Sequence, residues 1–172
     1  MRVLIAGVGN VLRGDDGFGV EVLHRLKRDL VGAEGVRFFE SGIAGVGLVQ
    51  QLLDGYDVLV ILDALDRGAP PGTVFVLVPD VEVLGAPGGE RHAIDLHQAD
   101  PEGVLHMAAA LGVLPRHVRI VGCQAAACDE LGAGLSDPVR AAVPTAAWQV
   151  RELLATWNRV EEEVHGPAPG TR

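Results

Sequence analysis

The sequence predicts an α/β domain, a three-layer α/β/α sandwich around a mostly parallel, twisted sheet of roughly five strands. Short apolar runs alternate along the chain with segments whose apolar residues recur at helical spacing, which is typical of strand-helix-strand units. The run DVLVILDAL, residues 57–65, is almost continuously apolar, as expected of a strand buried on both faces of a parallel sheet. With 172 residues, of which 48% are hydrophobic, the chain is long enough for one substantial core.

The first strand-turn-helix unit begins at the N-terminus, where RVLIAGV is followed by apolar residues at helical spacing. Further strands and helices alternate to the end of the chain. The predicted strands span residues 2–8, 35–41, 57–65, 72–79 and 117–124, and the predicted helices span 17–30, 45–55, 100–112 and 136–160.

The closing helix carries start signals at its first residues. Ser136 or Asp137 can cap it, Pro138 is tolerated in its first turn, and Pro144 is expected to kink it. After it, EEEVHGPAPGTR combines charge, proline and glycine. We therefore expect a single domain over residues 1–160 and a disordered tail over 161–172.

Composition excludes several classes of partner. The chain has 14 Lys and Arg against 23 Asp and Glu, a formal net charge of -9, and it has no cluster of basic and aromatic residues, so nucleic acid is not expected. Its apolar runs are far shorter than the roughly 20 residues of a membrane span, so no membrane insertion is expected. The N-terminus lacks the pattern of a secretory signal, which favours a cytoplasmic location. Cys123 and Cys128 are interpreted as small buried thiols.

Acidic side chains and one histidine follow the ends of predicted strands. GVGNVLRGDDGFGV places Asp15 and Asp16 after the first strand, Asp63 ends DVLVILD, and AIDLHQAD places Asp95 and His97 in a later loop. In open α/β sheets, ligands bind outside the carboxyl ends of the strands, so these loops can share one edge. Two carboxylates and an imidazole, with further positions left open, suit a divalent metal such as nickel or zinc.

Each candidate also has an ordinary structural explanation. An aspartate after an apolar strand, such as Asp63, can cap the next segment. Asp16 lies at a helix N-terminus, where the macrodipole stabilises a carboxylate by roughly 0.3–1 kcal/mol. A lone loop histidine such as His97 is more often not a ligand. The metal-site hypothesis therefore depends on the three residues meeting at one edge.

Other enzyme classes fit the sequence less well. The dinucleotide fingerprint G-x-G-x-x-G would need glycine at position 12, where the chain has Leu12, and the adjacent acids would repel a pyrophosphate. No Walker A lysine and no G-x-S-x-G elbow occur, and neither Ser41 nor Ser136 has an evident paired base. A nucleotide-dependent enzyme and a serine hydrolase are therefore disfavoured.

Three motifs together resemble the nickel-iron hydrogenase maturation proteases: GVGNVLRGDDGFGV, ILDAL and DLHQ. The resemblance extends from Met1 through GLSDPVRAAVP to about Val150. It implies an endopeptidase, a hydrolase that removes a short C-terminal extension from the nickel-loaded precursor of a hydrogenase large subunit. That precursor is the implied partner. Asp16, Asp63 and His97 are then the metal-contacting and catalytic residues.

The resemblance also implies that the metal is nickel carried by the precursor, that zinc or cadmium can replace it in vitro, and that no organic cofactor is needed. An incomplete set of ligands binds a metal weakly until a partner's ligands complete it. Such a set suits an enzyme that acts on the precursor only after nickel has been inserted. Three mechanisms stay open: nickel polarises the scissile carbonyl, nickel activates water, or nickel positions the tail while an acid such as Asp16 acts as the base. A non-catalytic nickel-sensing chaperone is the alternative function.

One segment departs from the family. The family commonly has aspartate and threonine where this chain has Glu40 and Ile43. Glu40 is a candidate for the missing carboxylate, and the glycines at 42, 45 and 47 are expected to leave room and backbone amides for the substrate tail. Asp15, in contrast to Asp16, is expected to cap or brace its loop.

Overall fold

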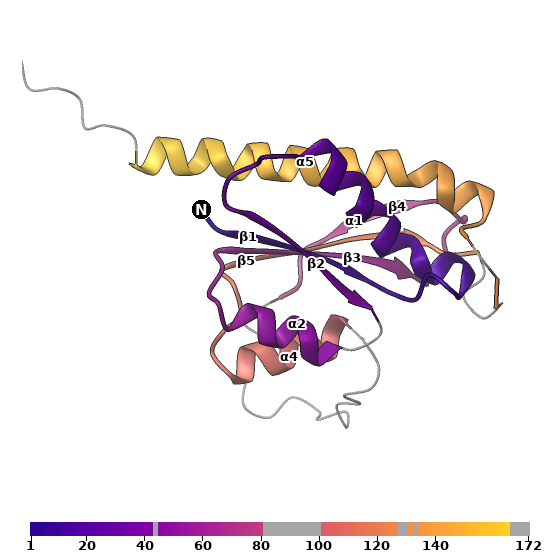
Figure 1. Cartoon of the computed structure of the whole chain (residues 1–172), viewed down its shortest axis with the longest axis horizontal. Coiled ribbons are helices and arrows are strands. Elements are labelled where there is room, and N and C mark those ends of the chain that lie inside the picture. Colours follow the sequence, from indigo (N-terminus) through magenta and orange to yellow (C-terminus); the bar gives the residue numbers. More distant parts are fainter. Residues whose placement is uncertain (43–44, 81–100, 127–130, 133, 166–172) are drawn as a thin grey trace, which may run out of the picture.

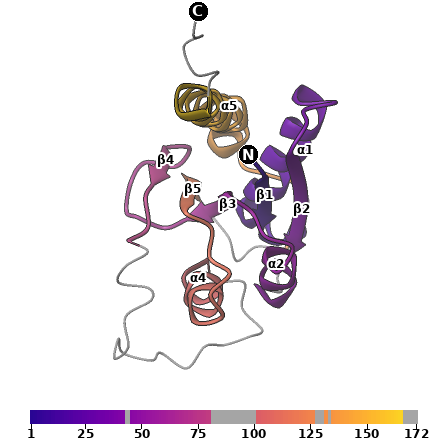
Figure 2. The same cartoon turned by 90° about the vertical axis from the view of Figure 1, so that its left-hand side faces the viewer.

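The computed structural model describes residues 1–42, 45–80, 101–126, 131–132 and 134–165, with side chains described as far as residue 160. Figure 1 shows a central sheet with helices on both sides, and Figure 2 shows the same three layers from one end of the sheet. The predicted α/β sandwich with a mostly parallel, five-stranded sheet is confirmed.

Ten elements make up the described part of the chain. In chain order they are β1 (Val3–Val8), the 3-10 helix η1 (Gly14–Gly17), α1 (Phe18–Asp29), β2 (Val36–Gly42), α2 (Gly45–Leu52), β3 (Val58–Leu65), β4 (Val74–Leu77), α4 (Pro101–Ala110), β5 (His117–Gln124) and α5 (Asp137–His165).

The sheet order is β2-β1-β3-β5-β4. The first four strands in this order run parallel, and only β4 is antiparallel, to β5. The loops that follow β2, β1, β3 and β5 therefore leave the sheet at one edge, which we call the carboxyl edge. This is the edge where the ligand sites of such sheets lie.

Each face of the sheet is covered by two helices, so the central strands are buried on both sides (Figure 2). Along β3 the side chains alternate: Val58, Val60 and Leu62 pack with α1 and α5, whereas Leu59 and Ile61 pack with α2 and α4. This alternation produces two apolar cores and explains why the sequence of β3 lacks the polar positions of a half-exposed strand.

Helix α5 is the longest element and spans 29 residues. It continues to His165, so residues 161–165, which the sequence places in a disordered tail, are helical. Residues 166–172 of that predicted tail lie outside the described part of the chain. Pro144 lies inside the helix. In the described part of the chain, no helix combines the length and the apolar character that crossing a bilayer requires.

Candidate active site

Asp16 lies at the carboxyl edge, in η1 between β1 and α1. The chain turns into η1 through Gly9, whose φ of 116° disfavours any other residue, and a Cβ there would lie 1.8 Å from the backbone oxygen of Asp16. The amide of Asn10 donates a hydrogen bond of 2.8 Å to Asp16 Oδ2. The glycine turn and this bond hold the Asp16 carboxylate, which is only partly buried, just beyond the end of β1.

Asp63 lies on the neighbouring strand, at the same edge. It is 8% exposed, and its Oδ1 accepts a hydrogen bond of 2.9 Å from the amide of Ala64. Strand β3 continues two residues beyond Asp63, so this side chain keeps the alternation of the strand and faces the α2 and α4 layer, like Ile61.

The start of α1 packs directly on the ends of β1 and β3. A Cβ at Gly19 would lie 2.1 Å from the carbonyl oxygen of Leu62 and 2.4 Å from that of Val8. Only glycine permits this approach. The 3-10 helix η1, which contains Asp16, also contacts β3, so Asp16 lies beside the strand that contains Asp63. The prediction that these two acids reach the same edge is confirmed.

Asp15 has a different role from its neighbour. It is 1% exposed, its Oδ1 accepts a hydrogen bond of 2.7 Å from the amide of Ser136, and its Oδ2 accepts bonds from the Ser136 hydroxyl at 2.9 Å and the Ala126 amide at 2.8 Å. The expected bracing role of Asp15 is confirmed, because this carboxylate fastens the loop after β1 to the start of α5. Ser136 precedes α5 as predicted, but its hydroxyl donates to Asp15.

Gln124, at the end of β5, organises the loop after β3. Its Oε1 accepts hydrogen bonds from the amides of Arg67, at 2.7 Å, and Ala69, at 3.2 Å, and its Nε2 donates to Asp66 Oδ1 at 3.1 Å. The Gln124 bond, followed by the Gly68 amide, lowers the pKa of the Asp66 carboxyl. Gln124 was not among the predicted site residues, although it is a polar residue at the carboxyl end of a buried strand, like Asp63.

Glu40 does not join Asp63 on its face of the sheet. It follows Phe38 by two residues on β2, and Phe38 packs into the core beneath α1 and α5. Consistent with this, Glu40 Oε2 lies 3.1 Å from Nε2 of His24 on α1. In the segment that follows, Gly47 lies in α2 against the Phe39 ring, where a Cβ would approach Cζ to 3.3 Å, so this glycine serves helix packing.

The third predicted ligand, His97, lies outside the described residues, as does Asp95. Within the described ranges, no group of three or more histidine, cysteine, aspartate or glutamate side chains is arranged to hold a metal. The metal role of Asp16, Asp63 and His97 therefore stays a prediction.

Cys123 is confirmed as a buried free thiol, whereas Cys128 lies beyond the described ranges. Burial, and secondarily the negative charge of Asp15, raises the pKa of the Cys123 thiol to about 11. The thiol is therefore protonated at neutral pH and is a poor nucleophile. The carboxyl edge thus offers the carboxylates of Asp16 and Asp63 among others, which can bind a cation or accept a proton, and no activated cysteine in its described part.

A family model described as hydrogenase maturation protease matches residues 20–152. The chain belongs to the hydrogenase maturation protease family. It is 38% identical over 173 residues to the hydrogenase expression/formation protein HupM of Azotobacter chroococcum, covering 97% of this chain and 81% of the relative. It is 35% identical over 159 residues to HupD of Thiocapsa roseopersicina, covering 92% and 70%.

Solved structures of hydrogenase maturation proteases share this fold. The hydrogenase maturating endopeptidase HybD from E. coli matches with a TM-score of 0.74 and 29% identity, over 91% of this chain and 93% of that one. A hydrogenase 2 maturation peptidase from a Thaumarchaeota archaeon matches with a TM-score of 0.68 and 33% identity, over 90% and 98%. The predicted family and hydrolase class are confirmed, and the substrate of this family is the hydrogenase large-subunit precursor.

Proposed function

We propose that this chain is the endopeptidase that removes a short C-terminal extension from the nickel-loaded precursor of a nickel-iron hydrogenase large subunit. The observation that carries the proposal is the arrival of Asp16 and Asp63 at one edge from adjacent parallel strands, in a chain of the maturation protease family. Two carboxylates on a backbone held by close glycine contacts form a prepared but open set of ligands for a cation.

In this proposal the nickel belongs to the substrate. Asp16, Asp63 and His97 contact it only after it has been inserted into the precursor, and the contact positions the C-terminal tail for cleavage. Asp16 is more exposed than Asp63, so it is the better candidate to accept a proton from the attacking water. Asp63 is the more buried of the two and serves as a fixed ligand.

The proposal is tested with nickel-loaded and nickel-free precursor and mass spectrometry of the precursor's C-terminus. The wild-type chain should shorten only the nickel-loaded precursor. Cleavage of both forms would contradict gating by the metal. Binding of the nickel-loaded form without a shorter product would favour the alternative, a nickel-sensing chaperone.

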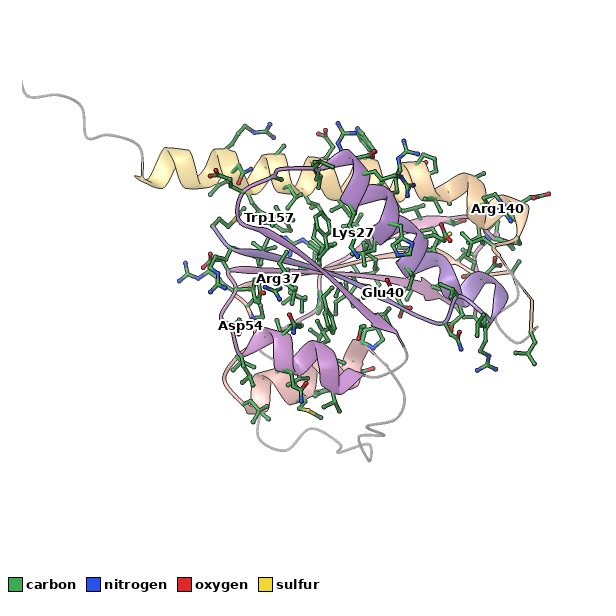
Figure 3. The ribbon with its side chains drawn as sticks, viewed as in Figure 1. Lys27, Arg37, Glu40, Asp54, Arg140 and Trp157 are labelled. Carbon is green, nitrogen blue, oxygen red and sulfur yellow. The ribbon has the colours of Figure 1, made fainter. Side chains whose placement is uncertain are left out.

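Substitution of the three residues separates site assignment from fold. Asp16→Ala, Asp63→Ala and His97→Ala should each lower the cleavage rate by at least about 100-fold, because each removes a contact to the substrate's metal. Asp54→Ala and His106→Ala are matched controls. Asp54 is exposed and lies at the opposite end of the molecule from Arg140 (Figure 3). His106 is on α4. Normal cleavage by all three site variants would overturn the assignment.

A further inference from the structure

Two leucines are exposed at the carboxyl edge, beside the candidate site. The side chain of Leu12 is 65% exposed and that of Leu131 is 88% exposed. A parallel backbone bridge joins Arg13 to Gly132, with the Gly132 amide donating to the Leu12 carbonyl at 3.3 Å and the Gly14 amide donating to the Gly132 carbonyl at 3.4 Å. The two leucines each precede a bridged residue, so they lie next to each other; we call them the Leu12–Leu131 pair.

The segment that carries Leu12 is held by the buried carboxylate of Asp15. Asp15, three residues after Leu12, accepts hydrogen bonds from Ala126 and Ser136, which flank the segment that carries Leu131. The buried carboxylate of Asp15 therefore joins the segment that carries Leu12 to Ala126 and Ser136. Neither leucine belongs to either core, so the pair does not serve the packing of the described chain. An apolar side chain on a backbone that is already held in place loses less conformational freedom on binding than one on a mobile backbone.

We propose that the Leu12–Leu131 pair is a docking surface for an apolar patch on the folded body of the large-subunit precursor. This inference rests on the proposed function. Leu12 and Asp16 are four residues apart in one segment, so a precursor whose tail reaches Asp16 comes close to the pair. The C-terminal tail of the precursor is a single extended peptide. Covering a side chain as exposed as that of Leu131 needs the larger surface of the folded precursor. Adjacent exposed leucines are the kind of apolar patch that marks a protein interface.

Charged residues of both signs flank the two leucines in the sequence: Arg13 follows Leu12, and Asp129 and Glu130 precede Leu131. Arg13 forms the bridge itself. Arg140 donates from Nη2 to the Leu135 carbonyl at 2.5 Å, and a Cβ at Gly134 would lie 3.4 Å from the same nitrogen. Figure 3 shows Arg140 at this end of the molecule. The expected partner surface is therefore an apolar patch with polar and charged groups at its rim.

The test is a kinetic comparison on nickel-loaded precursor with the double variant Leu12→Ser/Leu131→Ser. Loss of a docking surface should raise KM at least tenfold and leave kcat within twofold, because the groups near the reaction are unchanged. Leu53→Ser/Leu111→Ser is the matched control. These leucines are 62% and 57% exposed, and they follow α2 and α4 at the far end of those helices. A KM unchanged in the first variant, or raised equally in the control, would overturn the proposal.

Direct binding separates failure of docking from failure of the proposed function. Immobilised precursor should bind the wild-type chain at least ten times more tightly than the double variant, whether or not cleavage follows. Equal binding of the two, or no binding of the wild type, rejects docking. If the wild type binds in this way but never cleaves, only the protease function fails.

A second copy of this chain is the competing occupant. Sedimentation of the wild type should show no association that depends on the pair; self-association abolished in the double variant would overturn the proposal. Leu131→Ser alone is the second variant in case the double variant unfolds, and it should weaken precursor binding while melting within about 3 °C of the wild type.

Discussion

At the residue scale, two adjacent aspartates do different work because their surroundings differ. The carboxylate of Asp15 is buried and accepts three hydrogen bonds, whereas that of Asp16 is partly exposed and accepts a hydrogen bond from the Asn10 amide. A buried carboxylate with its acceptor sites filled stabilises the fold, and a more open one is available to a ligand. Asp15 therefore stabilises the fold, whereas its neighbour Asp16 is a candidate ligand.

This division predicts opposite outcomes for two alanine substitutions. Asp15→Ala should lower the free energy of unfolding by about 2 kcal/mol, because it leaves the hydrogen-bond donors of Ala126 and Ser136 without their acceptor. Asp16→Ala should change stability by less than about 1 kcal/mol and still abolish cleavage. Urea unfolding of both variants provides the measurement, and a larger loss of stability in Asp16→Ala would reverse the two roles.

At the element scale, α1 is positioned by contact between its first turn and two strand ends. Gly19 carries this contact, because its missing side chain lets the helix approach the carbonyl groups of Val8 and Leu62. The approach brings η1 and Asp16 against β3. The glycine is thus part of how the site is assembled, although it touches no substrate.

Replacing Gly19 by alanine should displace this helix. A Cβ would meet backbone oxygens at 2.1 and 2.4 Å, and backbone cannot turn away as a flexible side chain can, so we expect a loss of more than about 3 kcal/mol and much slower cleavage. Gly32→Ala is the control. Its φ of 81° makes alanine strained, but a Cβ there meets nothing within 4 Å, so about 1 kcal/mol is expected. Similar losses in the two variants by urea unfolding would contradict the packing argument.

The helices and strands could be predicted from the sequence, whereas hydrogen bonds between residues far apart in the chain could not. The apolar runs of β1 and β3 and the helical spacing after Phe18 are local patterns, so the strands, the helices and the shared edge of Asp16 and Asp63 followed from them. The partners of Asp15 lie 111 and 121 residues away, and no local pattern encodes such a pairing. For the same reason Ser136 or Asp137 was expected to cap its own helix, but the bond that the Ser136 hydroxyl donates to Asp15 was not foreseen.

At the scale of the whole molecule, α5 connects the two ends of the sheet. Its first turn follows Ser136, which Asp15 fastens at the carboxyl edge. Near its other end Trp157 is 8% exposed; its ring lies 6.2 Å from the His117 ring, and the Arg119 guanidinium carbon lies 5.7 Å above it. Because His117 begins β5, Trp157 closes the end of the core opposite the candidate site, and Figure 3 shows it well separated from Arg140.

This separation predicts a variant that loses stability and keeps its chemistry. Trp157→Ala should lower the free energy of unfolding by about 3–5 kcal/mol, the usual cost of truncating a large buried aromatic side chain, while the folded fraction keeps the wild-type kcat. Trp148→Ala is the matched control on the same helix, since that side chain is 53% exposed and should cost less than about 1 kcal/mol. Urea unfolding and cleavage rates per folded molecule test both variants. A fall in kcat for Trp157→Ala at full folding would mean that the far end of α5 is coupled to the carboxyl edge along the helix, and that stability and chemistry are not divided between the two ends.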